Sequence, residues 1–134
     1  MRIENAPYFV ELHITEVIPA GLPSAGDFRL EVEASLSGIS GFGSCWVNAR
    51  EVKTFCQAAK QLVSSSPGSA RLESISPGEF SLSLSRANSR GYVRVQVQIS
   101  KRLPAPSGIS GAFEVEWPAI VALTSWLEEP RANP

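Results

Sequence analysis

The residues that could do catalytic chemistry are few. His13 is the only histidine and Asp27 the only aspartate, so a Ser-His-Asp triad would have to use both. No GxSxG motif singles out a nucleophilic serine. Because the spacing supplies little of the geometry that a triad needs, we interpret His13 as a histidine on a strand face. We predict no catalytic residues.

Metal and thiol chemistry have little more support. A metal site needs several convergent His, Cys, Asp or Glu ligands, whereas this chain has one histidine and two cysteines eleven residues apart. We therefore predict no metal site and no cofactor. Cys45 and Cys56 lie in apolar stretches, and we expect both to be reduced, buried core residues. A nucleophilic thiol is the alternative, although no basic residue is evident near either cysteine.

Two glycine-rich stretches repeat one short motif. SGISGFG occupies residues 37–43 and SGISG returns at residues 107–111. A phosphate-binding loop would need a helix directly after the glycines, and a strand pattern follows instead, so we interpret the motif as a turn between strands. The echo indicates either two duplicated ββ(β)α halves, at about residues 8–64 and 70–128, or convergence of a Ser/Gly-rich chain on the same turn.

Length and composition describe one ordinary globular domain. The chain has 134 residues, of which 43% are hydrophobic and 19% are charged. Its net charge of −1 gives no general attraction to nucleic acid or to an anionic membrane, so we predict neither as a partner. The first residues include Glu4 and Asn5 where a signal peptide would need an apolar core, which predicts a cytoplasmic protein.

Apolar and polar residues alternate along most of the chain, which is typical of strands with one buried face. The pattern predicts strands at about residues 10–15, 28–36, 42–47, 70–75, 79–85, 91–100 and 112–116.

Two segments have helical spacing instead. From residue 49 to residue 64, apolar residues recur at i, i+3, i+4 and i+7, and Asn48 is placed to cap the helix. Pro118 begins a second helix at residues 117–128. The apolar stripe of the first helix consists of Val52, Phe55, Cys56, Ala59, Leu62 and Val63.

These elements predict an α+β fold. We expect a mainly antiparallel, curved sheet of about six to seven strands with both helices packed on it. Residues 1–128 would form the single domain, and residues 129–134 would form a disordered tail.

The polar faces of two predicted strands, or the loop at residues 101–112, are the expected partner-binding surface. Charges and amides of both signs recur on these strand faces, a pattern that suits electrostatic recognition of a protein. The alternative is that they only keep an exposed sheet soluble. We expect the three tryptophans to lie at the edge of the core. The candidate residues are Arg29, Glu31, Glu33, Arg94, Gln96 and Gln98.

The segments FRLEVEASLSG, WVNAREVKTFCQAAKQL, GSARLES, PGEFSLSLS and GYVRVQVQIS together resemble the WapI-type bacterial immunity proteins. The likeness covers about residues 28–99 and is a pattern of strands and one helix without a catalytic signature. The resemblance implies a cytoplasmic protein that neutralises a cognate toxin domain by binding it. It carries over no functional residues.

Three function classes follow from these observations. The first is a non-enzymatic protein-binding module, such as an immunity protein. The second is a small-ligand-binding or oligomeric β-scaffold, and a deep pocket with convergent polar groups would favour it. The third is a cysteine- or serine-dependent enzyme, which a perturbed thiol in a cleft would favour. Of these, we expect the binding module.

Overall fold

The computed structural model describes residues 1–64, 68–87, 90–101 and 107–130. Within them, eight strands and two helices follow one another along the chain. The elements are β1 (Arg2–Asn5), β2 (Tyr8–Val17), β3 (Phe28–Leu36), β4 (Ile39–Val47), α1 (Ala49–Val63), β5 (Ser69–Glu73), β6 (Phe80–Arg86), β7 (Tyr92–Lys101), β8 (Ser107–Glu116) and α2 (Trp117–Glu128).

The strands form two antiparallel sheets. The first has the order β1-β2-β3-β4 and the second β5-β6-β7-β8, so each sheet is a meander of neighbouring strands. A helix follows each sheet, and the order of four strands and one helix therefore occurs twice. The α+β class and the two helices are confirmed, whereas the expected single sheet of six to seven strands is wrong. Alternation reports which face of a strand is buried, not which strands are neighbours.

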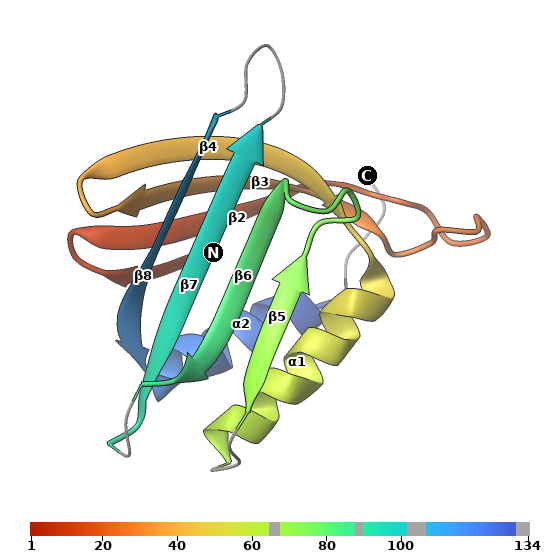
Figure 1. Cartoon of the computed structure of the whole chain (residues 1–134). Coiled ribbons are helices and arrows are strands. Elements are labelled where there is room, and N and C mark those ends of the chain that lie inside the picture. The colour runs from red at the N-terminus through yellow and green to blue at the C-terminus, as the bar shows by residue number, and fades with distance from the viewer. Residues whose placement is uncertain (65–67, 88–89, 102–106, 131–134) are drawn as a thin grey trace.

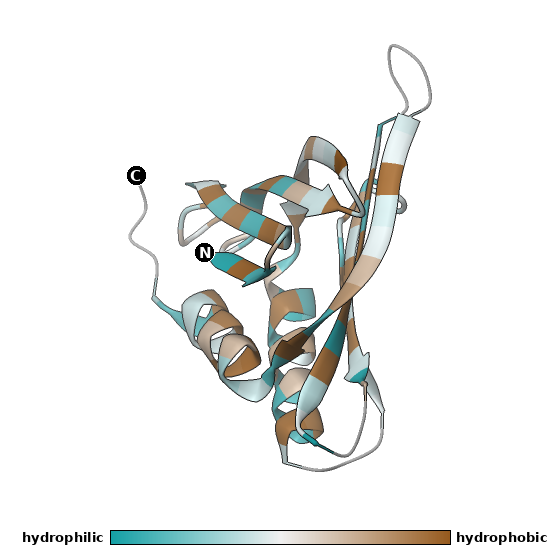
Figure 2. Ribbon diagram, turned by 90° about the vertical axis from the view of Figure 1, so that its left-hand side faces the viewer, coloured by the Kyte–Doolittle hydropathy of each residue, from teal (hydrophilic) through white to brown (hydrophobic). Residues whose placement is uncertain are grey.

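The first sheet and both helices lie on the same side of the second sheet (Figures 1 and 2). The strands of the first sheet run across those of the second. One continuous core fills the space between these layers. Its largest fully buried side chains include Leu30 from the first sheet, Leu82 from the second, Phe55 from α1 and Leu123 from α2. The two halves therefore share one core.

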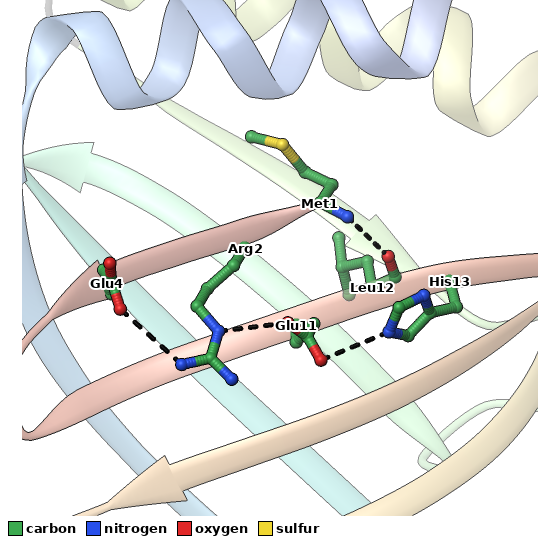
Figure 3. A network of polar contacts seen from close by, with 6 residues as sticks. All are labelled: Met1, Arg2, Glu4, Glu11, Leu12 and His13. Carbon is green, nitrogen blue, oxygen red and sulfur yellow. Dashed lines mark hydrogen bonds and ion pairs between the residues drawn. The ribbon is translucent and has the colours of Figure 1, made fainter.

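β1 is the strand that the sequence pattern did not predict. It is four residues long and has one buried apolar residue, Ile3, so it shows no alternation to detect. The terminal amino group of Met1 donates a hydrogen bond of 3.0 Å to the Leu12 carbonyl (Figure 3). The Leu12 amide donates one of 2.8 Å to the Met1 carbonyl in return. These bonds hold β1 on β2.

The first SGISG copy forms the predicted turn with its first two residues, and the second copy does not. Ser37 and Gly38, with φ of 52° and 80°, turn the chain between β3 and β4, and the rest of the first copy already belongs to β4. The second copy lies inside β8. This also corrects the expected loop at residues 101–112, because residues 107–112 are strand and residues 102–106 lie outside the described residues.

The helices begin and end within a residue of their predicted limits. The amide of Arg50 donates to the Asn48 side chain at 2.8 Å, which is the predicted cap. A second cap was not predicted: the amide of Ala49 donates to the Asp27 carboxylate, also at 2.8 Å. α2 ends at Glu128, and residues 131–134 of the predicted tail lie outside the described residues. No helix in the described part of the chain is long and apolar enough to cross a membrane.

Candidate protein-binding surface

The structure separates the six predicted binding residues into two groups of three. Arg29, Glu31 and Glu33 lie on β3, whereas Arg94, Gln96 and Gln98 lie on β7. In both strands, the apolar residues that alternate with these polar ones point into the common core. The two groups therefore lie on the outer faces of different sheets, which point away from each other, and they do not form one surface.

The outer face of the first sheet is rich in acidic residues and includes exposed aromatic rings. We call this surface the acidic face. Across its strands, Glu33 lies between Glu11 and Phe42, and Glu31 lies between His13 and Ser44. The acidic face consists of Arg2, Glu4, Phe9, Glu11, His13, Glu16, Arg29, Glu31, Glu33, Ser35, Ser40, Phe42, Ser44 and Trp46.

One side of the acidic face is already paired. Arg2 donates through Nε to Glu11 at 3.0 Å and approaches Glu4 at 3.7 Å, while the His13 ring lies 3.2 Å from Glu11 (Figure 3). The hydrogen bond with His13, followed by the one with Arg2, lowers the pKa of Glu11. Arg2 offsets the charge of one of these two carboxylates, so this side has less negative charge free for a partner.

The other side of the acidic face has uncompensated charge. Arg29 donates to the Ser44 hydroxyl at 2.9 Å and lies 3.5 Å from Glu16. Within the described residues, no ion pair involves Glu31 or Glu33. Beside these two carboxylates lies Phe42, with 52% of its surface exposed. This part of the acidic face therefore combines free negative charge with an exposed apolar ring.

Phe42 and Trp46 are the site residues that the sequence did not single out. Trp46 is 36% exposed on the acidic face, so its predicted place at the edge of the core is wrong. A signal was present, since the FGSCWV stretch carries apolar residues on both faces of its strand. Only the pairing of β4 with β3 shows that the face of β4 with Phe42 and Trp46 points away from the core.

A groove of about 600 Å³ lies beside β4. Lys101, at the end of β7, places its ammonium group 5.8 Å from the centre of the Phe42 ring. Glu79 is the other charged residue of the groove, so its walls carry both signs. The groove is lined by Phe42, Gly43, Ser44, Ser76, Pro77, Glu79, Ser100 and Lys101.

The outer face of the second sheet has a different character. Arg94 lies between Ser85 and Glu114, and the other rows are mainly serine and glutamine. Arg71 and Glu73 form an ion pair of 3.2 Å on the same sheet. Basic and acidic residues therefore occur together on this face.

The residues that were weighed for catalysis have structural contacts. His13 is bonded to Glu11 on the acidic face, while Asp27 caps α1 and is buried. Cys45 and Cys56 are buried and form no disulfide, and burial, with a smaller contribution from Glu79, raises the pKa of the Cys45 thiol to about 12. In the described part of the chain, no three His, Cys, Asp or Glu residues gather in a way that could hold a metal ion.

Comparison with known proteins adds no family to this picture. No protein-family model matches the chain, and no curated protein matches it either. The resemblance to WapI-type immunity proteins stays a prediction. The geometry of the acidic face and its groove is therefore the basis for a function.

Proposed function

We propose that this protein is a non-enzymatic binding module whose acidic face takes a protein with a basic surface. The observation that carries the proposal is the position of Glu31 and Glu33, two carboxylates without an ion pair among the described residues, beside the half-exposed ring of Phe42. A basic partner would supply the missing counter-charges.

The acidic face has both components of a protein interface. Large aromatic side chains are enriched among the residues that dominate binding energy, and Phe42 and Trp46 would be such anchors. The charges around them would steer a basic partner and reject an acidic one more than they would raise affinity. Of the candidate residues, Arg29, Glu31 and Glu33 belong to this surface, while the three on β7 are assigned to a surface of balanced polarity.

The resemblance of residues 28–99 to WapI-type immunity proteins extends the proposal to a class of partner. That partner would be a bacterial toxin domain, which the protein would neutralise in the cytoplasm by covering a basic surface. Toxins that act on nucleic acid carry such surfaces, because they must bind phosphates. Neutralisation by binding requires no catalytic group on this chain.

The groove beside β4 favours one alternative, a site for a small ligand. Its volume is in the range of ligand pockets, and Glu79 and Lys101 would orient a polar molecule. A thermal-shift screen of small zwitterionic metabolites tests this alternative: stabilisation that Lys101→Ala and Glu79→Gln both abolish would favour it over the binding module.

Site-specific photo-crosslinking tests the binding module. A photoreactive phenylalanine analogue replaces Phe42 in one bait and Gln96, on the outer face of the second sheet, in a matched bait. In lysate from cells that encode the protein, we expect one specific protein to crosslink at position 42 and not at position 96. Co-expression of that protein with and without this chain then tests neutralisation. Absence of a specific crosslink at position 42, or an equal one at position 96, would contradict the proposal.

A further inference from the structure

β4 is an open edge of the first sheet. It pairs with β3 on one side only, and the amide of Ile75 donates to the Trp46 carbonyl at 2.8 Å on the other side. In an antiparallel strand, the backbone groups of successive residues point to opposite sides. Because the β3–β4 register has no shift, Ser44, Phe42 and Ser40 point their backbone groups to the same open side as Trp46. No backbone hydrogen bond in the described chain reaches these three residues on that side.

The other three edge strands, β1, β5 and β8, contact other elements of the fold, whereas most of the β4 edge does not. The Asn5 side chain of β1 donates to the Glu114 carbonyl of β8 at 2.9 Å, and β5 packs against α1. Exposed edge strands are normally protected by charged residues, by proline or by a bulge. β4 has nine residues without a charge, a proline or a register shift. An edge of this kind is a template for an added strand.

We infer that an extended segment of the protein partner adds to β4 as a fifth strand of the first sheet. This inference rests on the proposed function and gives its mode of binding. The bond between Ile75 and Trp46 shows that the open side accepts a backbone donor at one end. The three residues beyond it would continue the ladder, and the groove beside Phe42 and Ser44 leaves room for side chains of the added strand.

The charges on the acidic face define the segment. A residue opposite Ser44 would lie one strand beyond it, so a long lysine or arginine side chain could pass over the small serine and reach Glu31. A residue opposite Phe42 lies two positions along on the same face, where the cation of a second lysine or arginine could lie over the exposed ring. The residues between these two point to the other face, where apolar side chains fit better. The partner segment would therefore alternate basic and apolar residues, with the basic ones on the acidic face. A second copy of this chain fits less well, because pairing β4 with β4 would place two acidic faces side by side.

Hydrogen exchange with a defined peptide tests strand addition. The probe is a nine-residue, end-blocked peptide of alternating lysine and valine, and a peptide of alternating glutamate and valine is the control. Binding of the probe should slow amide exchange of Ser40, Phe42 and Ser44 by at least about tenfold. The amides of Gly41 and Gly43 already face β3 and should change little. Protection of every second amide along β4 is specific to a strand added at its edge.

Proline at position 40 tests the same inference by mutation. Ser40→Pro removes an amide that points to the open side and leaves the β3 ladder intact, while Ser40→Ala is the matched control. We expect the proline variant to weaken binding of the probe by at least about tenfold and the alanine variant to bind as wild type does. The exchange measurement on wild type decides the matter if the proline variant does not fold.

Three results would overturn the inference and separate it from the proposed function. Absence of binding by the lysine-valine peptide at millimolar concentration would exclude strand addition, while the photo-crosslink at position 42 would still test the binding module by itself. The peptide could also bind without protecting the three amides from exchange, and Glu31→Gln with Glu33→Gln could weaken that binding. This result would support the acidic face as the binding surface and exclude the added strand. A dimer in sedimentation experiments without peptide, lost in Ser40→Pro, would make a second copy the occupant.

Discussion

Gly41 lies directly against Ile109, so that a Cβ atom on Gly41 would come within 2.6 Å of the Ile109 Cδ1 atom. Gly41 belongs to the first SGISG copy and Ile109 to the second. The two copies therefore meet where β4 crosses the second sheet. A similar contact occurs at Gly111, where a Cβ atom would lie 3.0 Å from that of Leu36. The echo in the sequence thus corresponds to close approach of two sheets, not to two turns.

Gly41→Ala should destabilise the protein by about 1–3 kcal/mol, because an added methyl group overpacks this crossing. Ile109→Ala should remove the clash, so the double variant should cost less than the sum of the two single changes. Urea denaturation of the four proteins measures the cycle. Strict additivity would mean that Gly41 and Ile109 are not in contact.

Phe55→Ala should lower the free energy of unfolding by about 3–5 kcal/mol, because it leaves a cavity in the core. Phe55 is 1% exposed and lies on the buried stripe of α1. Lys53→Ala, on the exposed side of the same helix, is the control and should cost little. Chemical denaturation of both variants checks this, and equal small effects would contradict the packing of α1.

Asp27→Ala should cost about 0.5–2 kcal/mol, because it removes an acceptor from the first turn of α1. The Asp27 carboxylate accepts from the Ala49 amide at 2.8 Å, and its negative charge also suits the N-terminus of the helix. Asp27→Asn keeps an acceptor and should cost less. Thermal unfolding of the two variants measures the difference; a larger loss for asparagine would be inconsistent with a capping role.

The Cys45 thiol should make stability fall at high pH. Burial raises its pKa from an ordinary value of 9.0 to about 12. Between these values the unfolded chain binds fewer protons than the folded one, so the free energy of unfolding decreases as pH rises. Well below pH 9 the thiol is neutral in both states and adds no pH dependence. Cys45→Ala should remove this part of the decline.

Comparison of wild type with Cys45→Ala isolates the thiol from lysines and tyrosines that titrate in the same range. Native Cys45 should also react slowly with a thiol reagent, because the buried thiol is not ionised. Rapid labelling of the folded protein, or equal alkaline decline in both proteins, would show that Cys45 is not buried as described.

Much of the fold was predictable because its signals are local. The stripe of Phe55 and Leu62 fixed the phase of α1, and alternation in β3 and β7 fixed their buried faces. The division into two sheets was not predictable, because strand pairing depends on contacts between residues far apart in the sequence. β1 was missed because Ile3 is its one buried residue.

Only the local part of the binding surface was predictable from the sequence. Glu31 and Glu33 were identified from their alternation with buried residues, but nothing in the sequence places Phe42 next to them. That contact depends on the register of β3 with β4. The sequence also could not show that Arg94 and Glu31 lie on opposite outer faces, because both belong to strands with the same pattern.

Two charge-matched double variants test the central claim, that the acidic face binds the partner. Glu31→Gln with Glu33→Gln and Gln96→Lys with Gln98→Lys each raise the net charge of −1 by two, on different sheets. The measurement is calorimetric affinity for the protein that crosslinks at position 42. The account predicts that the glutamate pair weakens binding by at least about tenfold, or 1.4 kcal/mol, and that the glutamine pair leaves it nearly unchanged. Equal losses, or a larger loss for the glutamine pair, would contradict it.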